Sequence, residues 1–113
     1  YQSEHFFVTR DSYPVTKYHT LIILKRCAPS FFHLTNEEVS DFLHTLKEQK
    51  SVIKKLDHTI TAFNIGINDG KDAGQSIAHL HIHLIPRRKG DMDNPQGGVR
   101  GVIPEKQKYV RRK

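Results

Sequence analysis

The chain has 113 residues, which is enough for one domain with a modest hydrophobic core. Its formal net charge is +6, from 18 Lys and Arg against 12 Asp and Glu. The sequence contains no run of 18 apolar residues, so it predicts no membrane span. The single cysteine, Cys27, cannot form an internal disulfide. We therefore expect one domain over residues 1–113, in the cytoplasm and without a membrane partner.

The first part of the chain predicts two strands. The segment 5–10 (HFFVTR) and the segment 19–26 (HTLIILKR) are rich in β-branched and aromatic residues. Between them, DSYP at 11–14 is typical of a turn.

A change of period then predicts a helix over residues 34–57. Apolar residues recur there at spacings of three and four, which favours one buried stripe: Val39, Phe42, Leu43, Leu46, Ile53 and Leu56. Thr35 and Glu38 have the spacing of a capping box at its start. Acidic residues in the first turn and Lys54 and Lys55 near the end suit the helix dipole.

Two more strands follow the helix, over residues 59–68 and 75–86, with a Gly- and Asp-rich loop at 69–74. Pro86 is expected to end the last strand, because proline cannot donate to a ladder. The remaining segment is rich in Gly and Pro and is expected to be mostly irregular. Its basic residues are expected to form a solvated end, so nucleic acid is an unlikely partner: Lys106, Lys108, Arg111, Arg112 and Lys113.

The segment AHLHIHLIPRR, residues 78–88, carries three histidines at every second position. Alternate side chains of a strand point to opposite faces, so His79, His81 and His83 are expected to share one face. The other face would hold the apolar set Ala78, Leu80, Ile82 and Leu84. If the strand over 59–68 pairs with this one, the histidines lie beside a small polar strip: Asn64, Gly66 and Asn68.

Three interpretations of the histidine row are open. A solvated polar face would explain one histidine, but three beside amides favour a site. A zinc site would need a ligand from elsewhere, such as His19 or Cys27, because the outer two histidines of a straight strand lie about 13 Å apart. The third interpretation is nucleophilic catalysis by a histidine whose tautomer is fixed by its neighbours.

The segment HLHIHLI at 79–85 matches the histidine-triad pattern, and three further segments resemble the same family: 10–23, 66–76 and 85–109. The chain therefore resembles the histidine triad (HIT) family, and most of all its fragile-histidine and bacterial dinucleoside-polyphosphate hydrolase branch. The resemblance implies an α+β fold with a five-stranded antiparallel sheet, one long helix, a short second helix or turn, and an irregular C-terminal tail. It also implies a homodimer whose sheets continue across the interface.

The resemblance implies a nucleotide hydrolase that acts at the α-phosphate of a dinucleoside polyphosphate such as diadenosine tetraphosphate. His81 would attack phosphorus and form a nucleotidyl-histidine. Its other ring nitrogen would donate to a backbone carbonyl, expected at His83. His79 would help to protonate the leaving group, and His19 would support the triad.

The resemblance also assigns substrate contacts. Asp11 would hold the ribose hydroxyls, and Asn68, Gln75 and Ser76 would contact the phosphates and the leaving group. No metal ligand and no cofactor is required, although magnesium is allowed as a companion of the polyphosphate. Arg87 and Arg88 are near enough in sequence to hold distal phosphates, with solvated turn residues as the alternative.

The sequence departs from the family pattern at two places. KYH at 17–19 stands where the family usually has PGH, so Tyr18 is expected either to narrow a base pocket or simply to pack. Cys27 stands where a histidine is common and is expected to be a small buried filler.

Three alternative functions stay open at this level. The first is a nucleoside phosphoramidase or adenylyl-conjugate hydrolase, with which Ser76 is compatible. The second is a nucleotide-binding signalling module with incidental turnover. The third is a nucleic-acid end processor that uses the basic tail, for which no aromatic stacking strip is visible.

Overall fold

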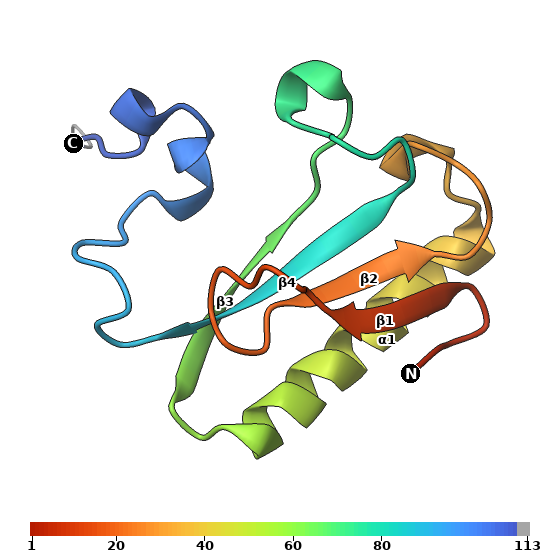
Figure 1. Cartoon of the computed structure of the whole chain (residues 1–113), viewed down its shortest axis with the longest axis horizontal. Helices are drawn as coiled ribbons and strands as arrows, with labels where there is room; N and C mark the ends of the chain where they lie inside the picture. The colour runs from red at the N-terminus through yellow and green to blue at the C-terminus, as the bar shows by residue number, and fades with distance from the viewer. Residues whose placement is uncertain (111–113) are drawn as a thin grey trace.

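The computed structural model describes residues 1–110, and Arg111, Arg112 and Lys113 of the basic end lie outside the described residues. One antiparallel sheet carries a long helix on one face (Figure 1). The strands are β1 (Phe6–Arg10), β2 (Thr20–Leu24), β3 (Ile60–Gly66) and β4 (His81–Arg88), and the helix is α1 (Asn36–Leu56). The spatial order β1-β2-β4-β3 makes β1 and β3 the sheet edges.

The expectation of five strands is wrong for residues 1–110, in which the sheet has four strands. The N-terminal segment forms an isolated bridge to β1 between Gln2 and Phe7 and is not a fifth strand. Residues 89–110, which follow β4, form two short 3-10 helices, η3 (Gly98–Val102) and η4 (Pro104–Lys106), and no strand. The glycines and prolines of this segment explain why it adds nothing to the sheet. The expected short second helix corresponds to η1 (Phe31–His33), and η2 (Lys71–Ala73) lies in the loop before β4.

Helix α1 forms where the apolar period predicted it, and its capping box is confirmed. The Thr35 side chain accepts from the Glu38 backbone N–H, and the Glu38 carboxylate accepts from the Thr35 backbone N–H. Satisfying these first-turn donors typically contributes about 1 kcal/mol to helix stability. No helix among residues 1–110 is both long and apolar enough to cross a membrane.

The buried stripe of α1 differs in part from the predicted one. Its fully buried members follow spacings of four and three, and three of the five are polar: Glu38, Phe42, Thr45, Gln49 and Ile53. Leu43 and Leu56 are instead 49% and 54% exposed. A reading that counts only apolar residues misses this stripe because Glu38 and Gln49 find hydrogen-bond partners inside the protein, whereas the buried Thr45 hydroxyl has none among residues 1–110. Gln49, for example, accepts from Arg10, which also donates to the buried Thr20 hydroxyl.

The hydrophobic core lies between α1 and the sheet, in two clusters. The larger cluster takes buried residues from β1, β2, the turn after β2, α1 and β4: Phe6, Val8, Ile22, Leu24, Ala28, Phe42, Leu80 and Ile82. The smaller one, at the other end of the helix, joins Ile53, Ile60 and Leu84, with Tyr18 and Phe63 packed against it. At about 25 cal/mol per Å² of buried apolar surface, these clusters supply the main stabilisation of the fold.

Strand β4 begins and ends later than expected. The segment 75–80 is not a strand, and Ala78 is exposed rather than buried. Pro86 does not end the ladder, because it is buried within β4 opposite Phe63, and pairing continues to Arg88 opposite Ile60. β2 pairs with β4 only up to Leu84, so beyond that point one side of β4 needs no ladder donor and tolerates a proline.

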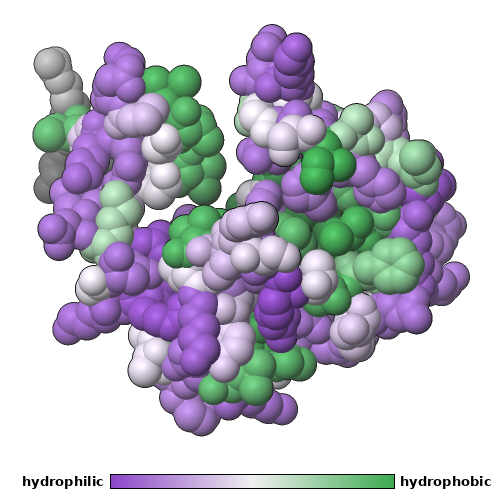
Figure 2. All heavy atoms as spheres, in the orientation of Figure 1, coloured by the Kyte–Doolittle hydropathy of each residue, from purple (hydrophilic) through white to green (hydrophobic). Residues whose placement is uncertain are grey.

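The C-terminal segment folds back on itself and stands apart from the helix layer (Figure 1). Gly97 has a φ of +89°, and a side chain there would collide with the backbone of Gln107. Figure 2 shows a deep hollow between this segment and the rest of the molecule, with apolar atoms of the segment facing it. The segment therefore forms one wall of a cavity whose other wall is the sheet.

Candidate active site

The face of β4 that points away from α1 carries the histidines. His81 and His83 are half-buried, whereas Ile82 and Leu84 between them are buried against the helix side. This alternation confirms the predicted division of the strand into two faces for residues 80–84. The pairing of β3 with β4 is also confirmed, and it sets Gly66 opposite His83 and Asn64 opposite Ile85. The polar strip therefore lies beside the histidines, and the missing side chain at Gly66 leaves room above the sheet.

His81 has one ring nitrogen committed and one available. Its Nδ1 lies 3.0 Å from the backbone carbonyl oxygen of His79. A carbonyl oxygen only accepts, so Nδ1 must carry the proton and Nε2 keeps its lone pair. The expectation that this carbonyl belongs to His83 is wrong. The ring folds back toward the preceding residue on its own face of the chain, and His83 follows it.

His79 precedes β4 and is anchored to β2. Its Nε2 lies 2.5 Å from the carbonyl oxygen of Leu24, so this nitrogen carries a proton and donates it in a hydrogen bond to that carbonyl. In this arrangement only Nδ1 is left to contact a substrate. Leu80 supports the same junction, because its backbone pairs with Leu24 on one side and Ala28 on the other.

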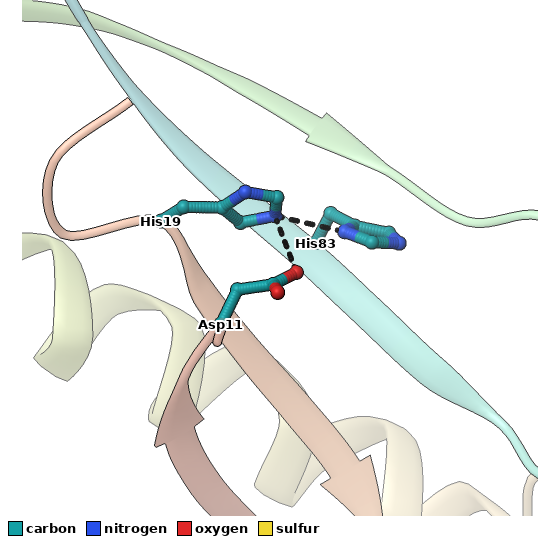
Figure 3. A group of neighbouring side chains, drawn as sticks. All are labelled: Asp11, His19 and His83. Carbon is teal, nitrogen blue, oxygen red and sulfur yellow. Dashed lines mark hydrogen bonds and ion pairs between the residues drawn. The ribbon is translucent and has the colours of Figure 1, made fainter. Parts of the chain in front are cut away.

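His19 and His83 are joined by a direct hydrogen bond between their rings (Figure 3). The backbone N–H of Val15 donates to His19 Nδ1 at 3.0 Å. His19 Nδ1 is therefore unprotonated, and the proton of the neutral ring sits on Nε2. This Nε2 lies 2.9 Å from His83 Nδ1, so His19 donates and His83 accepts. The proton of His83 consequently sits on its other nitrogen, which points away from His19 (Figure 3).

Both rings of the pair are held neutral. Burial lowers the pKa of His19, and the nearby Asp11 carboxylate offsets part of that effect. The pKa of His83 is lowered by burial first, and then by repulsion from His19 and His81. Since both values fall below the ordinary 6.5, the tautomers fixed by hydrogen bonds are those present at neutral pH.

Asp11 lies at the end of this pair. One of its carboxylate oxygens is 3.5 Å from His19 Nε2, and the other accepts from the Tyr13 backbone N–H at 2.8 Å. The second bond is the Asx-type turn predicted for 11–14. The first places the carboxylate beside the histidine pair (Figure 3).

Asp11, His19 and His83 also form the one group among residues 1–110 whose ligand atoms are close enough for a metal ion, all within 4.8 Å of one another. The hydrogen bonds do not suit such a site. His19 Nε2 bears a proton as long as Val15 donates to Nδ1, so it has no lone pair for a cation. Cys27, the other ligand considered for zinc, is not a member of this group and is exposed. It was expected to be a buried filler, but the neighbouring Ala28 takes the core position after β2.

A cavity of about 520 Å³ opens on the histidine face. His19 and His83 line it together with Asn64 and Asn68 of the polar strip. Its remaining walls come from apolar residues of β3 and from the C-terminal segment, including Val99, Val102 and Gln107. The cavity thus combines hydrogen-bond donors with an apolar wall, the usual composition of a small-molecule site.

Gln75 and Ser76 lie elsewhere, in a separate surface hollow formed with Lys71, Gly74 and Ala78. The Gln75 amide braces its own loop: it accepts from the Gly70 N–H and donates to the Pro29 carbonyl, both at 2.8 Å. The structure therefore groups Asp11 with His19 and His83, and places the His81 ring centroid 5.3 Å from that of His83. Asn68 joins His19 and His83 in the cavity lining, whereas Gln75 and Ser76 line a separate hollow.

Arg87 and Arg88 are engaged by carboxylates. Arg87 pairs with Asp91 through two hydrogen bonds of 2.9 Å and donates to Asn64. Arg88 pairs with Asp57 at 3.0 Å and donates to the Lys17 carbonyl. These hydrogen bonds fix the end of β4, and Arg87 also lines the cavity.

Sequence reasoning missed the partners that orient the site. Thr16 donates to the Pro86 carbonyl across 70 positions, and Asp57 bonds Arg88 across 31. The Val15 backbone N–H lies only four residues before His19, but a backbone donor has no side-chain signature. No local pattern marks them. Tyr18, for which two roles were open, packs against the core cluster of Ile53, Ile60 and Leu84.

The model of the HIT domain matches residues 1–90 of the chain. The chain belongs to the HIT family. It is 41% identical over 91 residues to the nitrilase and fragile histidine triad fusion protein of Caenorhabditis elegans, which covers 80% of the chain and 20% of that protein. The crystal structure of the worm protein superimposes with a TM-score of 0.76 over 85% of the chain and 24% of its own, at 40% identity.

Two further relatives have names that state an activity. The chain is 41% identical over 78 residues to an asymmetrical bis(5'-nucleosyl)-tetraphosphatase of Schizosaccharomyces pombe, covering 69% of the chain and 42% of the relative. It is 32% identical over 116 residues to a bifunctional bis(5'-adenosyl)-triphosphatase/adenylylsulfatase of Arabidopsis thaliana, covering 97% and 63%. The chain thus spans less than two thirds of the length of these curated relatives.

Proposed function

We propose that the protein hydrolyses dinucleoside polyphosphates at the α-phosphate through a nucleotidyl-His81 intermediate. The observation that carries the proposal is the contact between His81 Nδ1 and the His79 carbonyl. It leaves Nε2 as an unprotonated nucleophile on a rigid strand, next to His83, whose ring centroid lies 5.3 Å away and which lines the cavity together with Asn68.

In the first step, His81 Nε2 attacks the α-phosphorus. A P–N bond forms, and the P–O bond to the nucleoside polyphosphate breaks. The imidazole gains positive charge, and the His79 carbonyl stabilises it because it already accepts from Nδ1–H. In the second step, water attacks phosphorus and releases a proton to solvent. The P–N bond breaks, and the ring returns to its neutral form as the nucleoside monophosphate leaves.

The groups next to His81 would act as hydrogen-bond donors that stabilise negative charge on the phosphate, and they would not transfer a proton to it. His83 is neutral and carries its proton on the nitrogen directed away from His19, so it can donate to a phosphate oxygen. Asn68 supplies a further amide donor from the same cavity. Phosphoryl-type transfer depends mainly on such positioning and charge stabilisation. Asp11 remains the proposed ribose contact.

The names of the relatives agree with this chemistry. Those from S. pombe and A. thaliana are named as hydrolases of bis-nucleosyl tetraphosphates and triphosphates. The second is also named an adenylylsulfatase, which favours adenylyl-conjugate cleavage as the second candidate. Both activities use the same nucleophile and differ only in the leaving group.

The decisive experiment measures the hydrolysis of labelled diadenosine tetraphosphate and adenylyl sulfate by the purified protein, in parallel. A nucleotidyl-histidine is a phosphoramidate that is stable in base and labile in acid, so a base quench preserves the labelled intermediate. The wild type is expected to release adenosine monophosphate and to carry label on His81 after a rapid base quench. His81→Asn replaces the imidazole with a polar amide that lacks the nucleophilic ring nitrogen, and it is expected to give neither. Label on another residue would overturn the nucleophile assignment, and the relative kcat/KM values decide between the two leaving groups.

We also propose that the protein works as a cytoplasmic homodimer. β3 is a sheet edge, Ile65 on it is 48% exposed, and long uncovered edges are usually paired or protected. A second copy that pairs at this edge would continue the sheet. Sedimentation of the wild type and of Ile65→Lys tests this, with a shift to the monomer expected for the variant.

A further inference from the structure

The turn that leads into His19 has an unusual backbone. The His19 N–H donates to the Thr16 carbonyl at 3.0 Å, which closes a four-residue turn. Tyr18 is its third residue and has a φ of +74°. A positive φ at the third position normally calls for glycine or asparagine. Among residues 1–110, Asn94 is the only other non-glycine residue in this region of backbone space.

A bulky residue persists there only when its surroundings hold it. The Tyr18 side chain is half-buried against Ile53, Ile60 and Leu84, the core cluster at the end of α1. The Tyr18 carbonyl accepts from the buried Thr20 hydroxyl at 2.7 Å. Both the ring and the carbonyl are thus fixed to elements outside the turn.

Two further bonds attach the same turn to β4. The Thr16 hydroxyl donates to the Pro86 carbonyl at 2.5 Å, and Arg88 donates to the Lys17 carbonyl at 2.9 Å. Arg88 is itself held by Asp57 at the end of α1. The turn is therefore fixed to the strand that carries His81 and His83.

The geometry of this turn decides which nitrogen of His19 bears a proton. Val15 donates to His19 Nδ1 only because the chain reverses between residues 15 and 19. We propose that Tyr18 is a positioning residue: its core-anchored, left-handed backbone holds this turn, fixes the His19 tautomer, and so fixes the proton of His83. The inference deepens the proposed function and rests on it for its kinetic consequence.

The backbone and the ring can be separated by substitution. Tyr18→Gly removes the ring but favours a positive φ, whereas Tyr18→Val removes it and strongly disfavours one, since Val is β-branched. Tyr18→Phe keeps both properties and serves as the conservative control. Gly and Val should both lower the melting temperature through lost packing, and only Val should disturb the histidines.

The first measurement is ¹⁵N NMR of the imidazoles in the substrate-free full chain. Wild type, Phe and Gly variants are expected to show His19 protonated on Nε2 alone, and the Val variant a mixture of tautomers. The second measurement is turnover of diadenosine tetraphosphate. The Val variant is expected to lose roughly 10- to 100-fold in kcat with little change in KM, and the Gly variant to stay close to wild type.

Equal spectra and equal kcat for the Gly and Val variants would overturn the proposal, because the ring would then act through packing alone. If the Val variant does not fold, Tyr18→Ala and Tyr18→Gly repeat the contrast with a smaller steric difference. If the wild type cleaves no dinucleoside polyphosphate, the proposed function fails, and the nitrogen spectra still decide whether Tyr18 sets the His19 tautomer.

Discussion

The two faces of the sheet both bury polar groups, but they satisfy them differently. On the helix face, the Glu38 carboxylate receives two bonds from Arg26 and one from the Thr35 backbone. Gln49 likewise accepts from Arg10, so two of the three buried polar residues of α1 have internal partners, and the Thr45 hydroxyl has none among residues 1–110. On the opposite face, His79, His81 and His83 each use one ring nitrogen in an internal hydrogen bond and keep the other.

This difference separates stability from chemistry. A saturated polar group holds elements together and offers nothing to a ligand. A ring with one nitrogen fixed has a defined tautomer, and its second nitrogen becomes a donor or acceptor of known kind. We therefore expect substitutions on the helix face to change the free energy of unfolding, and those on the histidine face to change turnover.

The largest effect should follow from removing the nucleophile. His81→Asn is expected to lower kcat by about four to six orders of magnitude, as for other enzymes that lose the attacking group. The melting temperature should change little, since His81 is half-buried and outside both core clusters. Steady-state kinetics with thermal melts checks this. A large loss of stability with a small loss of kcat would remove the contrast between the faces.

The next effect concerns the histidine pair and its pH dependence. His19→Asn is expected to lower kcat by roughly 10- to 100-fold, because the His83 ring loses its fixed donor. In the wild type, protonation of this pair should contribute to the loss of activity only below pH 6.5, since the pKa of both rings is lowered. Removing His19 also removes its repulsion on His83, so the acid limb should move up toward 6.5.

The same pair contributes to stability with a definite sign. The unfolded chain binds protons at the ordinary histidine pKa of about 6.5, and the folded chain binds them only at lower pH. The free energy of unfolding should therefore fall as pH drops through 6.5 toward the folded-state values. Denaturant titrations at several pH values measure this, with the exposed His58→Asn as control. If the activity of His19→Asn fell at the same pH as that of the wild type, the electrostatic coupling between His19 and His83 would be contradicted.

How far the sequence predicts each face depends on the range of the interaction. The alternation of His81 and His83 with Ile82 and Leu84 is a local, period-two pattern, and it is predictable because strand geometry alone imposes it. The cap of α1 is predictable for the same reason. The His19–His83 bond joins residues 64 positions apart, and only a family resemblance suggested that His19 supports the triad.

The errors arose where burial depends on packing between elements. Leu43 lies on the helix that carries the core, yet it falls outside the stripe that the sheet covers. Cys27 and Ala28 are neighbours in one turn, and the direction of that turn decides which is buried. The positive φ of Tyr18 has no local signal at all, because the residue type argues against it.

A smaller effect, confined to stability, is expected on the helix face. Glu38→Gln keeps an acceptor for the Thr35 N–H but removes the charge that faces Arg26, and should cost about 1–3 kcal/mol of unfolding free energy. Arg26 lowers the pKa of Glu38 to about 2, so this contribution is present above pH 4.5 and is lost as pH falls from 4.5 toward 2. Turnover should be unchanged below the melting temperature.

Chemical denaturation at pH 7 and at pH 3 measures the Glu38 effect. Glu37→Gln, an exposed acidic residue one position earlier, is the matched control and should change stability little. If Glu38→Gln lowered kcat in the folded protein, the helix face would take part in the chemistry and the separation of the two faces would fail.

The smallest effect should come from Gln75, which lies on neither face. As a loop brace, Gln75→Ala removes one acceptor and one donor, and kcat/KM should fall by no more than about tenfold, or about 1.4 kcal/mol of transition-state stabilisation. Gln75→Glu distinguishes this role from a phosphate contact. Glu keeps the acceptor for the Gly70 N–H, so a brace tolerates it at least as well as Ala. A phosphate contact would make Glu far worse, because a second negative charge would face the substrate, and that outcome would mean that the loop closes over the histidines when substrate binds.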